Sequence, residues 1–364
     1  MKNEKVFFNT SFLGKKPTGI GNFIKEISKR FNSKQILFNQ KNEKLIFDIP
    51  NKLTAEFGIY GHIRRLIWTQ LFLPKLLKKS KINYLFSPIP EAPLGNKIKT
   101  IIFVHDLIPL LFPELNFATL YYKFWLPKIL NNSDLILCNS IATSNQINKI
   151  IGIDLNKIKV IPLGVKQKLN FERKNKTNYN FLILGRHARH KNIEAAIEAL
   201  SLIKNNKNID TKTRKKIKLL IIGPQKKGYT LDLIRLSQKL KINKDCEWIN
   251  WIEDEEKEKY LKESLSLIIP SYWEGFGLTA LEAMSFGTPI IASNRGSLPE
   301  VIADCGIYID PNKVKTISKA MEKIILERSL YKKLSYKSKK RAEIYTWEKT
   351  THLLQKTIEN HINH

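Results

Sequence analysis

A segment near residue 275 constrains the fold of this chain more than any other. Residues 265–270 are apolar and predict a short buried strand, and residues 278–285 predict a helix. Two glycines and a carboxylate lie between them, in residues 274–277. A strand, a glycine loop and a helix N-terminus therefore meet at one point, where free backbone N–H groups and the helix dipole favour an anionic phosphate. We expect an α/β fold with a phosphate site here.

Two carboxylates flank this loop. Glu274 lies before it, and Glu282 follows eight residues later on the expected helix. One carboxylate can therefore face a sugar while the other faces the far end of the same ligand. The segment predicts a site for a sugar that is joined to a nucleotide through phosphates.

The length and composition favour a globular protein of two domains. The chain has 364 residues, of which 43% are hydrophobic. Cys138, Cys246 and Cys305 are far apart, so neither a disulfide framework nor a zinc site is expected, and a reducing cytoplasm fits. No signal peptide is visible, and the longest apolar run, residues 101–112, is too short to span a bilayer. We expect a soluble or peripheral protein.

The chain is strongly basic, with a formal net charge of +29. Such a charge attracts nucleic acid, an anionic membrane surface or anionic substrates. A high lysine content also arises from biased genome composition. Charge alone therefore leaves the partner open.

In the first half, a β-branched run over residues 100–104 ends at His105 and Asp106. Ligands of parallel sheets bind at the carboxyl ends of the strands, so both residues are candidates for a site, although a lone histidine is commonly a satisfied polar group. Residues 15–23 predict a glycine loop that opens a helix through about Phe31. Gly19 and Gly21 can bring backbone close to a ligand, and a plain βα turn is the alternative.

Residues 62–81 combine basic and apolar side chains, and Pro74 divides them into two predicted helices. One interpretation is a basic amphipathic face that rests on a membrane carrying a lipid-linked acceptor. The other is a core helix with a solvated lysine face.

In the second half, a strand over residues 180–186 leads into a loop flanked by Arg186 and Lys191. Two cations at a strand end can hold a diphosphate, and solvated surface charge is the alternative. The acidic run at residues 253–256 is better explained by the first turn of a helix over residues 255–263 than by a metal. We find no convincing Asp-x-Asp pair at a strand end, so we expect no metal and no other cofactor.

The motif around residue 275 extends beyond the loop. Glu274-Gly275-Phe276-Gly277-Leu278 with Glu282, followed by residues 287–311, resembles the retaining glycosyltransferase family 4, which has the GT-B fold. The resemblance implies an α/β protein with two Rossmann-like domains that face each other across a deep cleft. The implied boundaries are 1–166 for the acceptor-side domain and 167–345 for the nucleotide-sugar domain, joined by a linker over residues 166–179. A terminal helix, 346–364, crosses back to the first domain, with Trp347 as its anchor.

The resemblance also implies roles for individual residues. Glu282 would bind the ribose, and Glu274 the transferred sugar, which His105 would contact from the other domain. Arg186 and Lys191 fall where the family binds the diphosphate. The remaining substrate-binding candidates are Gly19, Gly21, Asp106, Gly275, Phe276, Gly277, Leu278 and Thr279. Thr279 departs from the proline of many members, which should alter the helix start more than the chemistry.

The implied function is a retaining, metal-independent hexosyltransferase acting in the cytoplasm, at the inner face of the cell membrane. His105-Asp-Leu-Ile-Pro109 is similar to a mannosyltransferase-like branch of the family, which favours mannose from GDP-mannose. The acceptor would be a glycan or a lipid-linked sugar in polysaccharide or lipopolysaccharide synthesis. Alternatives are a UDP- or dTDP-sugar transferase, a sugar-nucleotide epimerase and a basic nucleic-acid-binding protein, although the basic residues are spread along the chain without a recognisable module.

Overall fold

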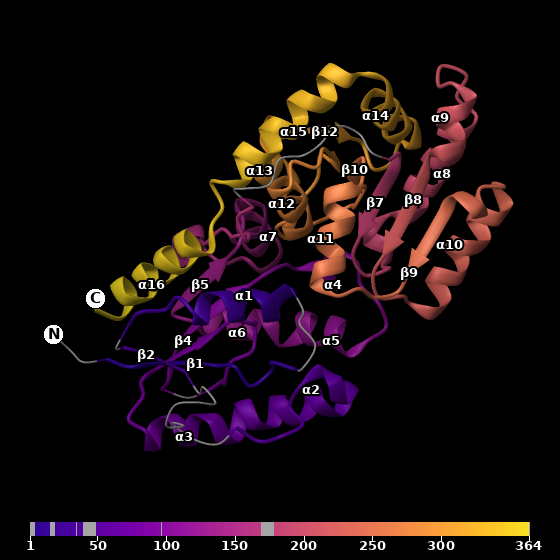
Figure 1. The fold of residues 1–364 in the computed structure, drawn as a ribbon. Coiled ribbons are helices and arrows are strands. Elements are labelled where there is room, and N and C mark those ends of the chain that lie inside the picture. Colours follow the sequence, from indigo (N-terminus) through magenta and orange to yellow (C-terminus); the bar gives the residue numbers. More distant parts are fainter. Residues whose placement is uncertain are drawn as a thin grey trace. The chain divides into compact units, whose positions relative to one another are not determined.

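A computed structural model describes residues 4–14, 19–33, 35–38, 49–95, 97–168 and 178–363. The chain divides into two compact units (Figure 1). Unit 1 is formed by residues 1–164 and 347–364, and unit 2 by residues 165–346. Each unit contains a six-stranded sheet in which all paired neighbours are parallel. The expected α/β fold with two Rossmann-like domains is therefore confirmed.

The sheet of unit 1 has the order β2-β1-β3-β4-β5-β6. Its strands are β1 (Val6–Phe8), β2 (Ile36–Phe38), β3 (Tyr84–Ser87), β4 (Lys99–Val104), β5 (Leu135–Cys138) and β6 (Ile158–Val160). Its longer helices are α1 (Gly19–Ser28), α2 (Gly58–Ile67), α3 (Leu73–Lys79), α5 (Phe117–Phe124), α6 (Leu126–Asn132), α7 (Ile141–Ile151) and α16 (Trp347–Asn363). The strand order reverses between β1 and β3, which makes the loops after these strands a natural ligand position.

The sheet of unit 2 has the order β12-β11-β10-β7-β8-β9. Its strands are β7 (Asn180–Leu184), β8 (Lys218–Ile222), β9 (Cys246–Ile249), β10 (Ser266–Ile269), β11 (Ile290–Ser293) and β12 (Gly306–Ile309). Its helices include α8 (Ile193–Lys204), α9 (Thr211–Lys216), α10 (Lys227–Lys239), α11 (Asp254–Glu263), α12 (Leu278–Ser285), α13 (Leu298–Ile302), α14 (Val314–Leu326) and α15 (Arg328–Ala342). The strand order reverses between β7 and β10, the position at which doubly wound sheets bind their ligands.

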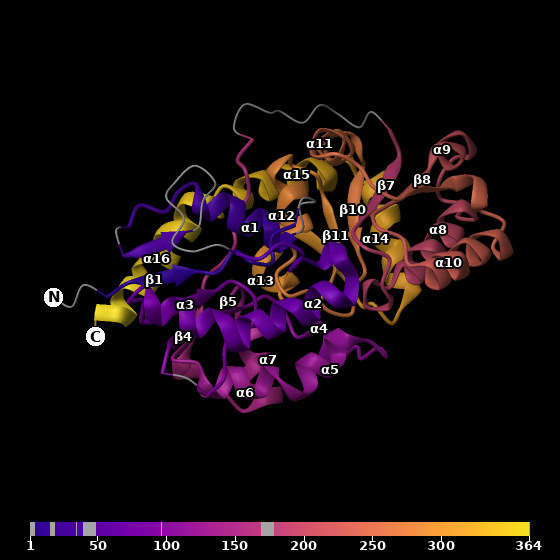
Figure 2. The same ribbon diagram turned by 90° about the horizontal axis from the view of Figure 1, so that it is seen from below.

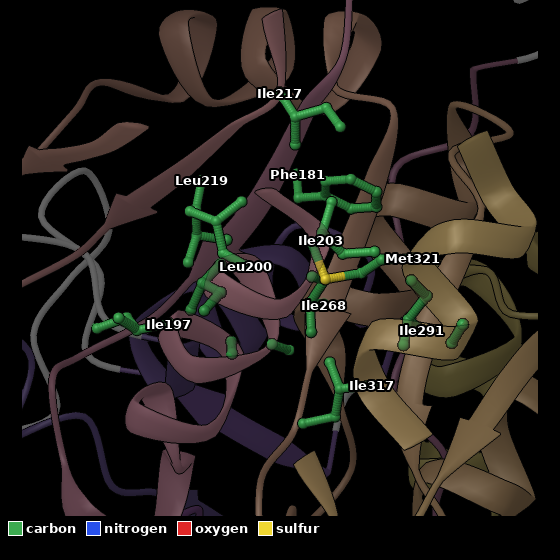
Figure 3. Close-up of a cluster of buried hydrophobic side chains, with 14 of the residues drawn as sticks. Phe181, Ile197, Leu200, Ile203, Ile217, Leu219, Ile268, Ile291, Ile317 and Met321 are labelled. Atoms are coloured by element: carbon green, nitrogen blue, oxygen red, sulfur yellow. The ribbon is translucent and has the colours of Figure 1, made fainter. Parts of the chain in front are cut away.

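Both faces of the second sheet are buried along its central strands, because nearly all residues of β7, β8, β10 and β11 are apolar and buried. Phe181 and its neighbours on one face pack against α8 and α14 in the core shown in Figure 3. Leu182 and Leu267 occupy the alternate positions and are also fully buried. On that side α12 packs against α11, α13 and α15. Continuous apolar strands with helices on both faces fix the direction of the strand ends, and with it the edge that can bind a ligand.

The elements expected around residue 275 are present. β10 spans Ser266–Ile269, and α12 begins at Leu278 and ends at Ser285, as the sequence predicts. The helical segment near Pro74 differs in detail. A π-helical turn, Trp68–Phe72, separates α2 from α3, and Pro74 lies in the first turn of α3, where its missing N–H is not needed.

Two expectations, the glycine loop near residue 19 and the linker near residue 170, need correction or lie outside the described residues. Gly19 and Gly21 lie in the first turn of α1 and not in a loop, and α1 ends at Ser28, earlier than the expected Phe31. Residues 15–18 of the expected glycine loop lie outside the described residues, as do residues 169–177 of the expected linker.

The terminal helix, α16, belongs to unit 1. α16 packs against α1 (Figure 1). Trp347 is buried with its ring 6.3 Å from that of Phe23, and Arg30 Nε donates to Glu348 Oε1 at 2.8 Å. Thr350 also donates to the carbonyl of Pro162, at 2.8 Å. Within the part of the chain that the structure describes, no helix is both long and apolar enough to cross a bilayer.

The core of unit 2 should be sensitive to the loss of Phe181, which is fully buried on β7. Phe181→Ala should lower the free energy of unfolding by about 3–5 kcal/mol, because it removes apolar contacts and leaves a cavity. Urea unfolding followed by circular dichroism measures the change. Tyr336→Ala is the control, since Tyr336 is 67% exposed, and an equal loss from both variants would contradict this core.

Candidate active site

The site lies at the carboxyl ends of β7 and β10, where the strand order of unit 2 reverses. A pocket is formed there by residues of both strands and of the loops that follow them. Its lining is Ile183, Leu184, Gly185, Arg186, Lys191, Ile193, Ile268, Ile269, Pro270, Ser271 and Glu274. The two adjacent strands thus bring Arg186, Lys191 and Glu274 together, although they are far apart in sequence.

Glu274 is held by an ion pair inside this pocket. Lys191 Nζ donates to both of its carboxylate oxygens, at 2.7 and 2.9 Å, and Ser271 Oγ donates to Oε1 at 2.6 Å. Burial would raise the pKa of Glu274, but the charge and hydrogen bond of Lys191, with smaller effects of Ser271 and His190, outweigh it. The pKa of Glu274 therefore lies below its ordinary value, and the residue is ionised at neutral pH.

The backbone of Glu274 is clamped by a second loop. Ser297 donates to the Glu274 carbonyl through both N and Oγ, at 3.2 and 3.0 Å. Gly296 lies beside it with φ +59°, and a Cβ there would stand 2.6 Å from the Glu274 carbonyl oxygen. Only glycine fits so close an approach with a left-handed backbone. The position of Glu274 thus depends on residues more than twenty positions along the chain.

Glu282 is paired as well, but in a different way. Lys257 of α11 donates to Glu282 Oε1 at 3.0 Å and contacts Asp254 Oδ1 at 3.1 Å. Burial raises the pKa of Glu282 above its ordinary value, and the Lys257 charge only partly offsets this effect. The two carboxylates of the motif therefore have pKa values shifted in opposite directions.

The N-terminus of α12 lies between these carboxylates. Gly277, with φ +88°, precedes the helix, and no described side chain caps it. The first backbone N–H groups of a helix have no intrahelical partner, so those of Leu278 and Thr279 can serve an anion. Phe276 is buried and packs edge-on against Tyr345, with the ring centroids 6.0 Å apart. This contact helps to fix the position of the loop.

The loop after β7 is anchored to the loop after β10. The buried Asn192, with φ +53°, donates through Nδ2 to the carbonyls of Pro270 and Pro311, at 3.1 and 2.8 Å. The Tyr272 N–H also donates to the His190 carbonyl, at 2.8 Å. Arg186, by contrast, is exposed and forms no ion pair with any described residue. The anchored loop places Lys191, while the guanidinium of Arg186 remains available to an anion.

The other predicted site residues belong to unit 1. His105 follows β4, and its Nε2 lies 3.0 Å from the carbonyl of Pro88. Burial lowers the pKa of His105 to about 4, so the ring is neutral at physiological pH. Because a carbonyl only accepts, Nε2 bears the proton and Nδ1 is left as an acceptor. Asp106 Oδ1 accepts from the Ile108 N–H at 2.9 Å, a contact that starts the short helix α4 (Ile108–Leu111).

Sequence reasoning missed the residues that hold the predicted ones. Three of them, Ser271, Asn192 and Lys257, hold their neighbours through side-chain contacts that no local sequence pattern predicts. Gly296 allows the close approach of the Glu274 backbone because it has no side chain. The acidic run before Lys257 lies in the first turn of a helix, α11, as the sequence predicts. Among the described residues, no group of three or more His, Cys, Asp or Glu is arranged to hold a metal ion.

Two family models match the chain over most of its length. The model for glycosyl transferases group 1 matches residues 165–341, and the model for glycosyltransferase family 4 matches residues 19–168. The chain belongs to glycosyltransferase family 4. The enzyme is thus a hexosyltransferase, as the motif around residue 275 predicts.

Relatives agree with this assignment, and a solved structure agrees with the fold. The enzyme is 28% identical to the O-antigen chain mannosyltransferase RfbU of Salmonella typhimurium, over 88% of this chain and 90% of that protein. It is 26% identical to the MMP alpha-(1->4)-mannosyltransferase of Mycolicibacterium hassiacum, over 58% of this chain and 51% of that one. Its fold is similar to sucrose-phosphate synthase from Thermosynechococcus elongatus, with a TM-score of 0.74 at 16% identity, covering 98% of both chains.

The opposite pKa shifts of Glu274 and Glu282 predict opposite effects of pH on stability. Ionised Glu274 stabilises the folded enzyme above pH 4.5, and this contribution is lost as the pH falls through its lowered pKa. Glu274→Gln should therefore lose less stability on acidification than the wild type. The raised pKa of Glu282 means that the wild type loses stability as the pH rises from 4.5 to that pKa, because the folded state resists ionisation of this residue. Glu282→Gln should therefore lose less stability than the wild type over the same pH range.

Melting temperatures across the acidic and neutral range measure these differences. The exposed Glu255→Gln, on α11, is the control for loss of one carboxylate. Parallel pH profiles for Glu274→Gln and Glu282→Gln would contradict the opposite environments of the two residues.

Proposed function

We propose that the enzyme transfers a hexose from a nucleoside diphosphate sugar to a glycan or lipid-linked acceptor, with retention of configuration and without a metal. The observation that carries this proposal is the pocket that joins Lys191, Arg186 and Glu274 beside the N-terminus of α12. One end of this constellation is cationic and rich in N–H donors, which suits a diphosphate. The other presents a carboxylate, which suits sugar hydroxyls.

Each group then has one part of the donor to bind. Lys191 has three N–H donors, of which two go to Glu274, and the third is left for a phosphate oxygen. Arg186 and the amides from Gly275 to Thr279 would complete the diphosphate site, with Phe276 and Gly277 shaping the loop. Glu274 would accept from hydroxyls of the transferred sugar, and Glu282 from the ribose.

Metal independence follows from the source of positive charge. Two cations and a helix N-terminus stabilise a departing diphosphate in the way that a divalent ion does elsewhere. Retention would arise by front-face attack, with the leaving phosphate assisting deprotonation of the acceptor. Glu274 is held at both oxygens by Lys191, so it serves as a fixed hydrogen-bond acceptor and need not be a covalent nucleophile.

Unit 1 would supply the acceptor side of the reaction. His105 is neutral, and its Nδ1 can accept a hydrogen bond from a hydroxyl of the transferred sugar. Asp106, Gly19 and Gly21 are the other residues of unit 1 that we propose as substrate-binding. Closure of the enzyme over its substrates would exclude water, which would otherwise hydrolyse the donor.

The donor we favour is GDP-mannose. Its support is that several relatives are mannosyltransferases, including the O-antigen chain mannosyltransferase RfbU, 90% of whose length aligns with this chain. The same relatives favour an acceptor in the synthesis of cell-surface polysaccharide such as lipopolysaccharide. UDP- or dTDP-sugars remain the alternative donors for the same pocket.

A thermal-shift panel of GDP, UDP, dTDP and ADP with their common sugar conjugates tests the donor site. GDP-mannose at ~100 times its dissociation constant should stabilise the wild type by roughly 2.7 kcal/mol, with EDTA present. Glu282→Ala and Arg186→Ala should lose the shift, whereas the neighbouring Arg189→Ala should keep it.

A shift only from UDP or dTDP compounds would change the donor. Salt-dependent binding of DNA with no nucleotide shift would contradict transferase function, and sugar epimerised without an acceptor would indicate an epimerase.

A membrane surface is the second partner that we propose, and an exposed apolar stripe on unit 1 supports it. Ile59, Ile63, Ile67 and Leu71 recur every four residues along α2 and the π-helical turn, and they are 51%, 39%, 48% and 58% exposed. The neighbouring α5 and the residue that follows it add the exposed Leu120, Phe124 and Trp125. The two helices lie side by side in Figure 1 and Figure 2, with the rings of His62 and Phe117 6.2 Å apart.

The charges around this stripe indicate an anionic lipid surface. Residues 58–81 and 117–132 contain no Asp or Glu, and their exposed cations are Arg64, Lys75, Lys78, Lys79, Lys81, Lys123 and Lys128. An apolar face on helices whose own charged residues are all cations binds anionic bilayers by burying side chains below the headgroups and attracting the lipid charge. The enzyme would then meet a lipid-linked acceptor at the inner face of the cell membrane.

Vesicle flotation tests this surface. The enzyme should bind phosphatidylcholine vesicles that contain phosphatidylglycerol, and bind neutral vesicles or vesicles in about 1 M salt far less, since that salt shortens the Debye length to about 3 Å. Changing Ile63, Ile67 and Leu71 to Gln should weaken binding at least about tenfold, because each apolar side chain contributes about 1.5–3 kcal/mol when buried. The control changes Ile150, Leu202 and Leu326 to Gln, which are similarly exposed elsewhere. Unchanged binding by the first triple variant, or self-association that it abolishes without lipid, would contradict membrane docking.

A further inference from the structure

Lys257 connects the ribose-binding candidate to a helix outside the family motif. It lies on α11, and its Nζ contacts Glu282 Oε1 on α12 at 3.0 Å and Asp254 Oδ1 on its own helix at 3.1 Å. The side chains of Lys257 and Glu282 are both about four-fifths buried, at 21% and 20% exposure. A contact of this kind, between partly desolvated charges, restrains both side chains more than a surface ion pair does.

The contact between Lys257 and Glu282 involves only one of the two carboxylate oxygens. Lys257 engages Oε1, and no described residue forms a hydrogen bond with Oε2. Glu274 differs, because Lys191 occupies both of its oxygens and Ser271 adds a third bond. Glu282 is therefore held in place while one of its oxygens keeps its full capacity to accept.

The other charges near Glu282 are unfavourable to its ionised form. Burial raises the pKa of Glu282, and the carboxylates of Asp254 and Glu258 raise it further. Lys257 is the group that counteracts them, through its charge and its hydrogen bond. α13 and α15 also pack against α12, but the Arg341 guanidinium of α15 is directed at the carbonyls of Glu300 and Val301.

We propose that Lys257 is a positioning residue for the nucleotide, fixing the Glu282 carboxylate through Oε1 so that Oε2 faces a ribose hydroxyl. The proposal rests on the proposed role of Glu282 in binding the ribose. Lys257 itself does not touch the donor. Its effect is to hold an acceptor in one orientation and to keep it charged, which matters because hydrogen bonds from hydroxyls to a carboxylate are stronger than those to a neutral acid.

A dependence of nucleotide binding on pH follows from this arrangement. Protonation of Glu282 converts an acceptor into a donor and removes the attraction of Lys257, so nucleotide affinity should fall as the pH drops through the pKa of Glu282. Without Lys257, burial and the two neighbouring carboxylates act unopposed. The loss of affinity should then occur at a higher pH.

The test is the dissociation constant of GDP and UDP, measured by calorimetry as a function of pH, for the wild type and three variants. In Lys257→Met the pH at which affinity halves should rise by about 1–3 units, the usual effect of one opposite charge at contact distance. Lys257→Arg should restore the wild-type profile. Lys259→Met is the matched control, because Lys259 is an exposed lysine two residues along α11, on the opposite side of the helix. It should behave as the wild type.

Kinetics give a second measurement that a purely structural role would not reproduce. Lys257→Met should raise the KM for the donor about tenfold or more at neutral pH and leave kcat within about twofold, because ribose contacts are made equally in the ground and transition states. An unshifted pH profile in Lys257→Met, or an equal shift in Lys259→Met, overturns the proposal. If the wild type binds neither nucleotide, the proposed function itself fails. If the wild type binds a nucleotide but the pH profile of Lys257→Met is unshifted, only the role of Lys257 fails.

Discussion

The ion pair between Lys191 and Glu274 is the contact on which the rest of the site depends. It joins the loop after β7 to the loop after β10, across the point where the sheet order reverses. Removing one partner of a buried pair costs about 3–5 kcal/mol, since it leaves the other charge unpaired in a poorly solvated place. Asn192 and Ser271 hold the same two loops through further hydrogen bonds, and Ser297, from the loop after β11, holds the Glu274 backbone. The charged pair is thus surrounded by a frame that keeps its geometry.

The two carboxylates of the motif lie in different electrostatic environments, which suit the different roles that we propose for them. Glu274 faces a cation that satisfies it fully, and its pKa is lowered. Glu282 sits beside other carboxylates with one oxygen unengaged, and its pKa is raised. Two residues of the same type, eight positions apart, are therefore distinguished by their neighbours alone. The neighbour that matters most for each is a lysine, and each lysine comes from a different loop or helix.

Much of the fold could be predicted from the sequence, because the signals were local. The apolar run before residue 270 and the glycines that follow it locate β10 and α12 to the residue or nearly so. His105 and Asp106 are at a strand end for the same reason. The contacts of the site could not be predicted in this way. That Lys191 pairs with Glu274, or Lys257 with Glu282, depends on which strands are neighbours and on how α11 packs, and neither is encoded by spacing along the chain. Gly19 and Gly21 show the converse error, since a glycine pair predicts a loop but here begins a helix.

The terminal helix gives the chain an unusual order of assembly. Because α16 belongs to unit 1, the whole of unit 2 is inserted between two segments of unit 1. Domains generally fold as units during synthesis, beginning at the N-terminus. Unit 2 can complete its core as soon as it has left the ribosome, whereas unit 1 must wait for Trp347 and the rest of α16, which emerge after unit 2. The earlier domain in the sequence is therefore the later one to be finished, and a ribosome that stops before residue 347 leaves the Phe23 face of unit 1 without its cover.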